Sequence, residues 1–144
     1  MAQKSVLFNI FNDLTNAVKT IVDAKYIFLK DRPNTEGEDK PMSKFVVIDL
    51  PVSMEDYVIG TKKTLLNTYG VLYLFVQARK NTTLDVNAMG DFVDKAIALF
   101  PFVGDYCTAA NPVVRLSGSD GHGFQVATIT FDLQTKWMAF ENNN

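Results

Sequence analysis

The sequence has few of the residues that build metal centres, disulfides and hydrolytic sites. Its 144 residues include one cysteine, one histidine and one tryptophan. A single cysteine cannot form an internal disulfide, so we expect Cys107 to be a buried thiol that packs as a small hydrophobic side chain. His122 and one distant cysteine do not supply the ligands of a zinc site. We therefore expect no metal and no other cofactor.

The chain also lacks a strong charge of either sign and a long apolar run. The formal net charge is −2 and the isoelectric point is near 5.3, so no basic field is present to hold nucleic-acid phosphates. The longest apolar run is Val71–Val76, whereas a membrane-spanning helix needs about 20 residues. These absences predict a soluble protein that does not associate with a membrane and does not bind DNA specifically.

The clearest pattern in the chain runs from residue 67 to residue 100. Residues 67–79 are rich in β-branched and aromatic side chains, and both faces of Val71–Val76 are apolar, which predicts a central strand covered on two sides. If this strand extends back to Thr64, Gly70 marks a bulge or a bend. Apolar residues then recur at helical spacing up to Phe100, where Pro101 ends the predicted helix.

The other elements are shorter. An amphipathic helix is predicted over Ser5–Val22, and strands over Tyr26–Leu29 and Lys44–Leu50 are predicted to form a hairpin across an exposed loop at residues 30–43. The polar side of the first helix is expected to hold Asn9, Asn12, Asp13, Asn16 and Lys19.

Towards the C-terminus, residues 102–111 look irregular, and a closing hairpin is predicted from Pro112–Ser117 and Phe124–Leu133. Residues 51–63 fit neither the helical nor the strand period, and residues 141–144 are expected to fray. Together these elements predict one α+β domain over residues 1–144, in which an antiparallel or mixed sheet with a long central strand is packed by two helices.

Two groups of residues invite a catalytic interpretation. Ser119, Asp120 and His122 lie together in the glycine-rich tip Gly118–Gly123, but a triad needs a rigid scaffold and an oxyanion hole, so turn chemistry is the favoured interpretation. Asp91 and Asp94 are neighbours on the second predicted helix, where a solvated surface is favoured over a catalytic carboxylate pair. We therefore predict no catalytic residues.

The order of these elements resembles that of phage tail-terminator and neck-completion (head-tail connector) proteins. The likeness is strongest from residue 69 to residue 131: a strand ending in the basic residue Arg79 leads into the helix Leu84–Phe100, and a final hairpin with a glycine-bearing tip leads into Gln125–Phe131. Members of that family form rings that close or join the head-to-tail channel through which DNA passes, and they are not enzymes. The resemblance implies a structural ring subunit without a cofactor.

The resemblance also implies partners and a location. It implies a homo-oligomeric ring of six-fold or twelve-fold symmetry, contacts with neighbouring connector or tail proteins, and DNA that passes without specific binding. The protein would be found in the virion after assembly in the cytoplasm of the host bacterium. Charged residues expected at the subunit interface are Arg32, Glu36, Glu38, Asp39, Lys40, Arg79 and Arg115. Deletion of Asn34–Asp39 is expected to weaken assembly and to spare the fold.

The alternative interpretation is a small cytoplasmic α+β domain that binds or hydrolyses a ligand in a pocket between the sheet and the helices. Aromatic side chains with polar tips commonly line such pockets. The candidates in this sequence are Tyr57, Tyr69, Tyr73, Tyr106 and Trp137.

Overall fold

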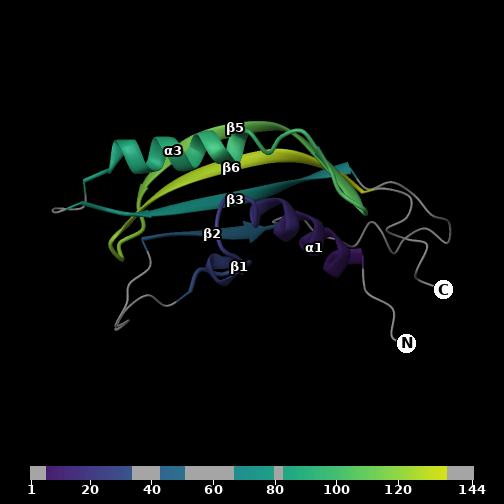
Figure 1. Ribbon diagram of the computed structural model, residues 1–144, viewed down its shortest axis with the longest axis horizontal. Coiled ribbons are helices and arrows are strands. Elements are labelled where there is room, and N and C mark those ends of the chain that lie inside the picture. Colours follow the sequence, from purple (N-terminus) through teal and green to yellow (C-terminus); the bar gives the residue numbers. More distant parts are fainter. Residues whose placement is uncertain (1–5, 34–42, 51–66, 80–82, 136–144) are drawn as a thin grey trace.

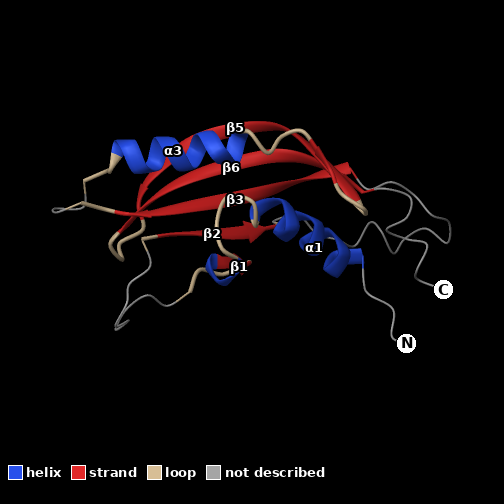
Figure 2. Ribbon diagram, in the orientation of Figure 1, coloured by secondary structure: helices blue, strands red, loops and turns tan. Residues whose placement is uncertain are grey.

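The computed structural model describes residues 6–33, 43–50, 67–79 and 83–135 (Figure 1). These residues form one mixed, curved sheet with two α-helices, which confirms the predicted α+β class (Figure 2). The elements are α1 (Val6–Val18), the 3₁₀ helix η1 (Ala24–Tyr26), β1 (Ile27–Leu29), β2 (Lys44–Asp49), β3 (Asn67–Gln77), α3 (Val86–Ile97), β4 (Phe102–Val103), β5 (Cys107–Ser119) and β6 (Phe124–Thr135).

The sheet has the order β1-β2-β3-β6-β5-β4. β3 pairs with β2 on one side and along its whole length with β6 on the other, so the predicted position of this strand in mid-sheet is confirmed. The predicted extension of this strand over residues 64–66 lies outside the described residues. The unassigned segment at residues 51–63 and the tail at residues 141–144 also lie outside them.

Two predictions about connections are wrong. β1 pairs with β2 in parallel, with Ile27 opposite Val46, so residues 30–43 do not join these strands as a hairpin. Residues 102–111 are not irregular either: they contain β4 and the first part of β5, which pairs with the end of β6. Both errors concern pairing between segments far apart in the chain, which local patterns do not report.

Both helices pack on one face of the sheet. Ile10, Leu14 and Val18 of α1 and Met89, Phe92 and Ala96 of α3 join one core cluster with alternate residues of the central strands. The sheet contributes Val46, Ile48, Leu72, Leu74, Ala127, Ile129, Phe131 and Leu133, each no more than 2% exposed. Cys107 is also fully buried there, as predicted.

The opposite face of the sheet carries a second, smaller apolar cluster. It consists of Phe45, Val47, Phe75, Phe124 and Val126, all of which are buried. The rings of Phe45 and Phe75 are stacked with centroids 4.3 Å apart, and the Phe124 ring meets the Phe45 ring edge-on at 5.1 Å. The prediction that β3 is covered on both faces is confirmed in this part of the sheet.

Two side chains assigned to the polar side of the first helix are in fact buried. Asn9 is 3% exposed and Asp13 is 6% exposed. The Oδ2 atom of Asp13 accepts hydrogen bonds from the backbone N–H groups of Tyr106, at 2.6 Å, and Cys107, at 3.0 Å. Asp13 therefore attaches α1 to the start of β5, and its charge is compensated by these two donors.

Candidate functional site

The turn between β5 and β6 depends on the backbone conformations of its glycines and on hydrogen bonds to the carboxylate of Asp120. Gly118, Gly121 and Gly123 have φ angles of 86°, 78° and 90°, a region that glycine adopts without strain. The Oδ1 atom of Asp120 accepts hydrogen bonds from the N–H groups of His122, at 2.7 Å, and Phe124, at 3.1 Å. The predicted hairpin and its turn chemistry are confirmed, and the Asp120 carboxylate is directed at the backbone of its own turn.

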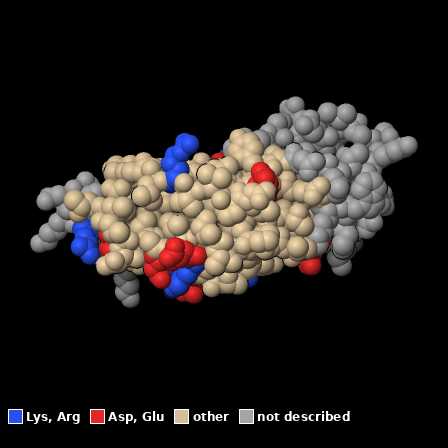
Figure 3. All heavy atoms as spheres, turned by 90° about the horizontal axis from the view of Figure 1, so that it is seen from above, with Lys and Arg blue, Asp and Glu red and all other residues tan. Residues whose placement is uncertain are grey.

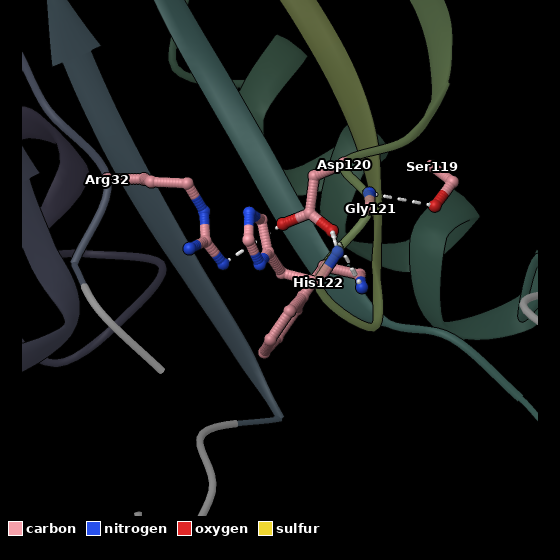
Figure 4. A network of polar contacts seen from close by, with 6 residues as sticks. Arg32, Ser119, Asp120, Gly121 and His122 are labelled. Carbon is pink, nitrogen blue, oxygen red and sulfur yellow. Dashed lines mark hydrogen bonds and ion pairs between the residues drawn. The ribbon is translucent and has the colours of Figure 1, made fainter. Parts of the chain in front are cut away.

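Arg32 connects this turn to the segment that follows β1. Its Nη2 atom lies 3.0 Å from Oδ2 of Asp120 (Figure 4). Its guanidinium carbon lies 5.7 Å from the centroids of both the Phe45 and Phe75 rings. The side chain of Asp120 is only 7% exposed and that of Arg32 is 25% exposed. The guanidinium thus combines an ion pair with stacking on the aromatic cluster, two interactions that suit its flat, weakly hydrated shape.

The structure describes two more of the residues predicted at a subunit interface, Arg79 after β3 and Arg115 on β5. Arg79 is exposed, and its Nη2 atom lies 3.7 Å from Oδ1 of Asp85, the residue that caps α3 by accepting from the N–H of Ala88. Arg115 is exposed on β5 and makes no ion pair with another described residue. The remaining predicted interface residues, Glu36, Glu38, Asp39 and Lys40, lie outside the described residues, as does the segment Asn34–Asp39.

A long part of β5 forms an open edge of the sheet. β4 pairs with β5 only at Thr108 and Ala109, and beyond that point no described strand lies on the outer side of β5. Val113, Val114 and Leu116 in this open part are 66%, 38% and 60% exposed. Seen from above in Figure 1, the described part of the molecule has one group of acidic and basic side chains near one edge, and its other charged side chains lie singly (Figure 3). The edge therefore offers unpaired backbone groups flanked by apolar side chains.

The open part of β5 is bounded by two irregularities. The pairing with β6 shifts between Ala110 and Val113 and again between Leu116 and Gly118. At the first shift Asn111 has a φ of 59°, and its side-chain Nδ2 donates to Oδ2 of Asp132 at 2.8 Å. The stretch Val113–Leu116 between the shifts keeps regular antiparallel register and presents an unbroken segment of edge.

A hollow of about 460 Å³ lies near one end of the sheet. Several of the residues that line it lie on the sheet face opposite the helices. The full lining consists of Thr68, Thr108, Ala110, Asn111, Asp132, Leu133 and Gln134. None of the described tyrosines proposed as pocket walls lines this hollow: Tyr69 is 40% exposed and lies opposite Asp132, Tyr73 packs against the aromatic cluster, and Tyr106 packs against the core beneath the helices. Tyr57 and Trp137 lie outside the described residues.

The carboxylates considered for catalysis are on the solvent side of α3. Asp91 and Asp94 are both exposed, and Oδ2 of Asp91 lies 3.1 Å from Nζ of Lys95, one turn further along the helix. In the described part of the chain, no three histidine, cysteine or acidic residues are grouped so that they could hold a metal ion. Among the described helices, none combines the length and the apolar character needed to cross a membrane.

Sequence patterns did not identify Asp13 as a buried acceptor, and they indicated Asp120 only as part of a turn. Both accept backbone N–H groups of residues whose positions depend on the tertiary fold or on the turn. A signal for Asp120 was present in the Ser-Asp-Gly sequence of the tip, because aspartate before glycine commonly accepts such bonds in turns. No comparable signal identifies Asp13, which lies in a helix that reads as amphipathic.

Comparison with known proteins identifies a similar fold but indicates no function. No protein-family model matches the chain, and no curated protein matches it. The structure is similar to a solved protein that bears a sequence number in place of a functional name, with a TM-score of 0.57, 9% sequence identity, and coverage of 89% of this chain and 91% of that chain. At this identity the similarity concerns the fold alone. The class defined by the fold and the site is thus an α+β domain with two helices on one sheet face and an open β5 edge.

Proposed function

We propose that this chain is a structural subunit of a phage virion ring, either a tail terminator or a head-tail connector, which assembles as a homo-oligomer around the DNA channel. The observation that carries the proposal is the open β5 edge with its exposed Val113, Val114 and Leu116. The order of elements, which resembles that of tail-terminator and neck proteins, gives the proposal its particular form.

An open sheet edge of this kind is unusual in a protein that works alone. Monomeric proteins commonly protect their edges with short strands, inward-pointing charges or a covering loop. The open part of β5 has bulges at its ends, but between them it holds apolar residues on both faces and a single charge, Arg115. Association with further copies would cover these groups, and a net charge of −2 would let DNA pass a lumen without tight binding.

Native mass spectrometry and electron microscopy test this proposal directly. We expect the purified protein to form a discrete oligomer of six or twelve copies, visible as rings, and antibodies against the chain to label the neck or the tail end of purified virions. A strictly monomeric protein at high concentration that is also absent from virions would overturn the proposal.

The hollow beside Asn111 and Asp132 supports a second candidate, a small ligand-binding or hydrolytic domain. Its volume of about 460 Å³ falls within the range of small-molecule sites, about 300–1,000 Å³. A thermal-shift screen with metabolites tests it, since a ligand at 100 times its dissociation constant stabilises a protein by about 2.7 kcal/mol. An unchanged melting temperature across all chemical classes, together with rings in the microscope, would favour the structural subunit.

A further inference from the structure

The two edges of the sheet match in strand direction. β1 is parallel to β2, and each later neighbour up to β5 is antiparallel, so β5 runs opposite to β1. In a head-to-tail ring, the rotation that places the next copy beside the first keeps strand directions nearly unchanged. The β5 edge of one copy would therefore meet the β1 edge of the next as an antiparallel pair, the arrangement already present between most strands of the sheet.

The two edges also match in which face each side chain occupies. Leu29 of β1 lies opposite Ile48 of β2, and Val114 of β5 lies opposite Ile129 of β6, so both belong to the face covered by the helices. Leu29 is 49% exposed and Val114 is 38% exposed. Because side chains alternate between faces, only every second register keeps the faces of two joined sheets continuous.

One of these registers brings apolar side chains of the two edges together. It pairs Leu29 with Val114 and Ile27 with Leu116, which covers apolar side chains by apolar side chains on the helix side. It also pairs Phe28 with Arg115 on the opposite face, where the guanidinium can lie over the Phe28 ring.

Opposite charges are available at the two edges. Arg115 on the β5 edge and Asp31, which follows β1, are both exposed, and neither makes an ion pair with another described residue. In the register above, Arg115 lies opposite Phe28 and Asp31 falls about three positions further along the joined edges, so the two opposite charges attract each other across the interface without being directly paired. Such rim charges contribute more to orientation and specificity than to affinity.

We propose that the partner of the β5 edge is a second copy of this chain, whose β1 strand adds to Val113–Leu116 in the register Leu29–Val114. The proposal rests on the ring function proposed above and specifies how neighbouring subunits of that ring are joined. It makes the sheets of successive subunits continuous and places every pair of helices on the same side of the continuous sheet.

Engineered disulfides test this register. Opposite Cβ atoms in an antiparallel pair lie about 4.5–5.5 Å apart, close enough for a disulfide after a small adjustment. We expect a chain carrying both Leu29→Cys and Val114→Cys to give a ladder of covalent multimers after mild oxidation, whereas each single variant stays monomeric on a non-reducing gel. Cys107 is fully buried and does not compete. The matched control pairs Leu29→Cys with Val86→Cys, a 68% exposed position on α3, and should give no ladder.

The outcomes separate the register from the ring itself. Dimers from the Val114→Cys variant alone would show two β5 edges paired about a two-fold axis and would overturn the register. Rings seen by native mass spectrometry without any cross-link in the double variant would overturn the inference and leave the proposed function standing. If the unmodified chain forms no oligomer, both fail.

A charge exchange gives a second, independent readout. Arg115→Glu should weaken subunit association by about two- to fivefold per contact, the range expected for an exposed ion pair. Adding Asp31→Arg to that variant should restore association. The assay uses about 50 mM salt, because exposed charges are only weakly screened at low ionic strength. If Arg115→Glu leaves association unchanged under these conditions, the two charges do not meet.

Discussion

The ring of Phe131 lies directly over the backbone of Gly70. The two residues are opposite each other in β3 and β6, and a Cβ added at Gly70 would stand 2.6 Å from Cζ and 2.9 Å from Cε2 of Phe131. Phe131 is 1% exposed, and its ring centroid is 5.0 Å from that of Phe100. The pairing continues through Gly70 without a shift, so the described part of β3 has no bulge there. Glycine is needed there to admit the ring.

Replacement of Gly70 by alanine should therefore lower the free energy of unfolding by about 1–3 kcal/mol, the usual cost of forcing an extra group into a packed core. Urea denaturation measures it. Phe131→Leu in the Gly70→Ala background should recover part of the loss, since a smaller side chain yields the space. Equal stability of Gly70→Ala and the unmodified protein would contradict the contact.

Gly90 offers the opposite case. It is an exposed glycine inside α3, and a Cβ added there meets no atom within 4 Å. We expect Gly90→Ala to raise the free energy of unfolding by about 0.5–1 kcal/mol, because alanine loses less backbone entropy than glycine in a helix. The same urea titration serves as the measurement. A loss of stability would contradict the open space around this position.

The pair Arg32–Asp120 should be energetically coupled. Asp120→Ala removes the ion pair and the acceptor of two backbone N–H groups, and we expect a cost of about 1–3 kcal/mol. Asp120→Asn keeps an acceptor oxygen for the turn and should cost less. In a double-mutant cycle with Arg32→Ala, the two effects should sum to more than the effect of the double variant. Strict additivity would show that the ion pair contributes nothing, as is common for exposed pairs.

Asp13 should be the most sensitive polar residue of α1. Asp13→Ala leaves the N–H groups of Tyr106 and Cys107 without their acceptor, so we expect a loss of about 2–3 kcal/mol. Hydrogen exchange followed by NMR should show faster exchange at these two amides in the variant. The exposed neighbour Asn12 provides the control, since Asn12→Ala should change stability by less than about 0.5 kcal/mol.

The pKa of Lys30 should respond to Asp49. Nζ of Lys30 lies 2.8 Å from Oδ1 of Asp49, and the hydrogen bond and negative charge of that carboxylate raise the pKa of Lys30 above 10.5. A raised lysine pKa contributes stability that is fully present below pH 10.5 and is lost as the pH rises through the folded-state value. An NMR titration of the Lys30 side chain should show this raised pKa returning towards 10.5 in Asp49→Asn. An unchanged titration curve in that variant would exclude Asp49 as the cause.

Several elements could be predicted from the sequence because their signals are local. The apolar residues of α3 recur at helical spacing and Pro101 follows them, while β6 alternates from Phe124 to Thr135 between two sheet faces. The glycines at Gly118, Gly121 and Gly123 indicated a turn because their backbone conformation is costly for other residues. The fold class and the central position of β3 follow from these patterns.

The pairing of distant segments was decided by the tertiary structure. Nothing local to Ile27–Leu29 indicates that it pairs in parallel with β2, and the first part of β5 is ordered by its contact with the end of β6.

The same holds for the polar groups of the candidate site. The sequence indicated a polar helix side for Asp13, a subunit interface for Arg32 and a turn for Asp120. In the structure each of them also lies beside a donor, a ring or an opposite charge supplied by another part of the chain. Propensity and periodicity act over neighbouring residues, so local patterns are enough to show which segments of this chain can form helices, strands and turns. The pairing of edges and the burial of charges depend on the free energy of contacts between residues far apart in the chain, so they become visible only in the folded molecule.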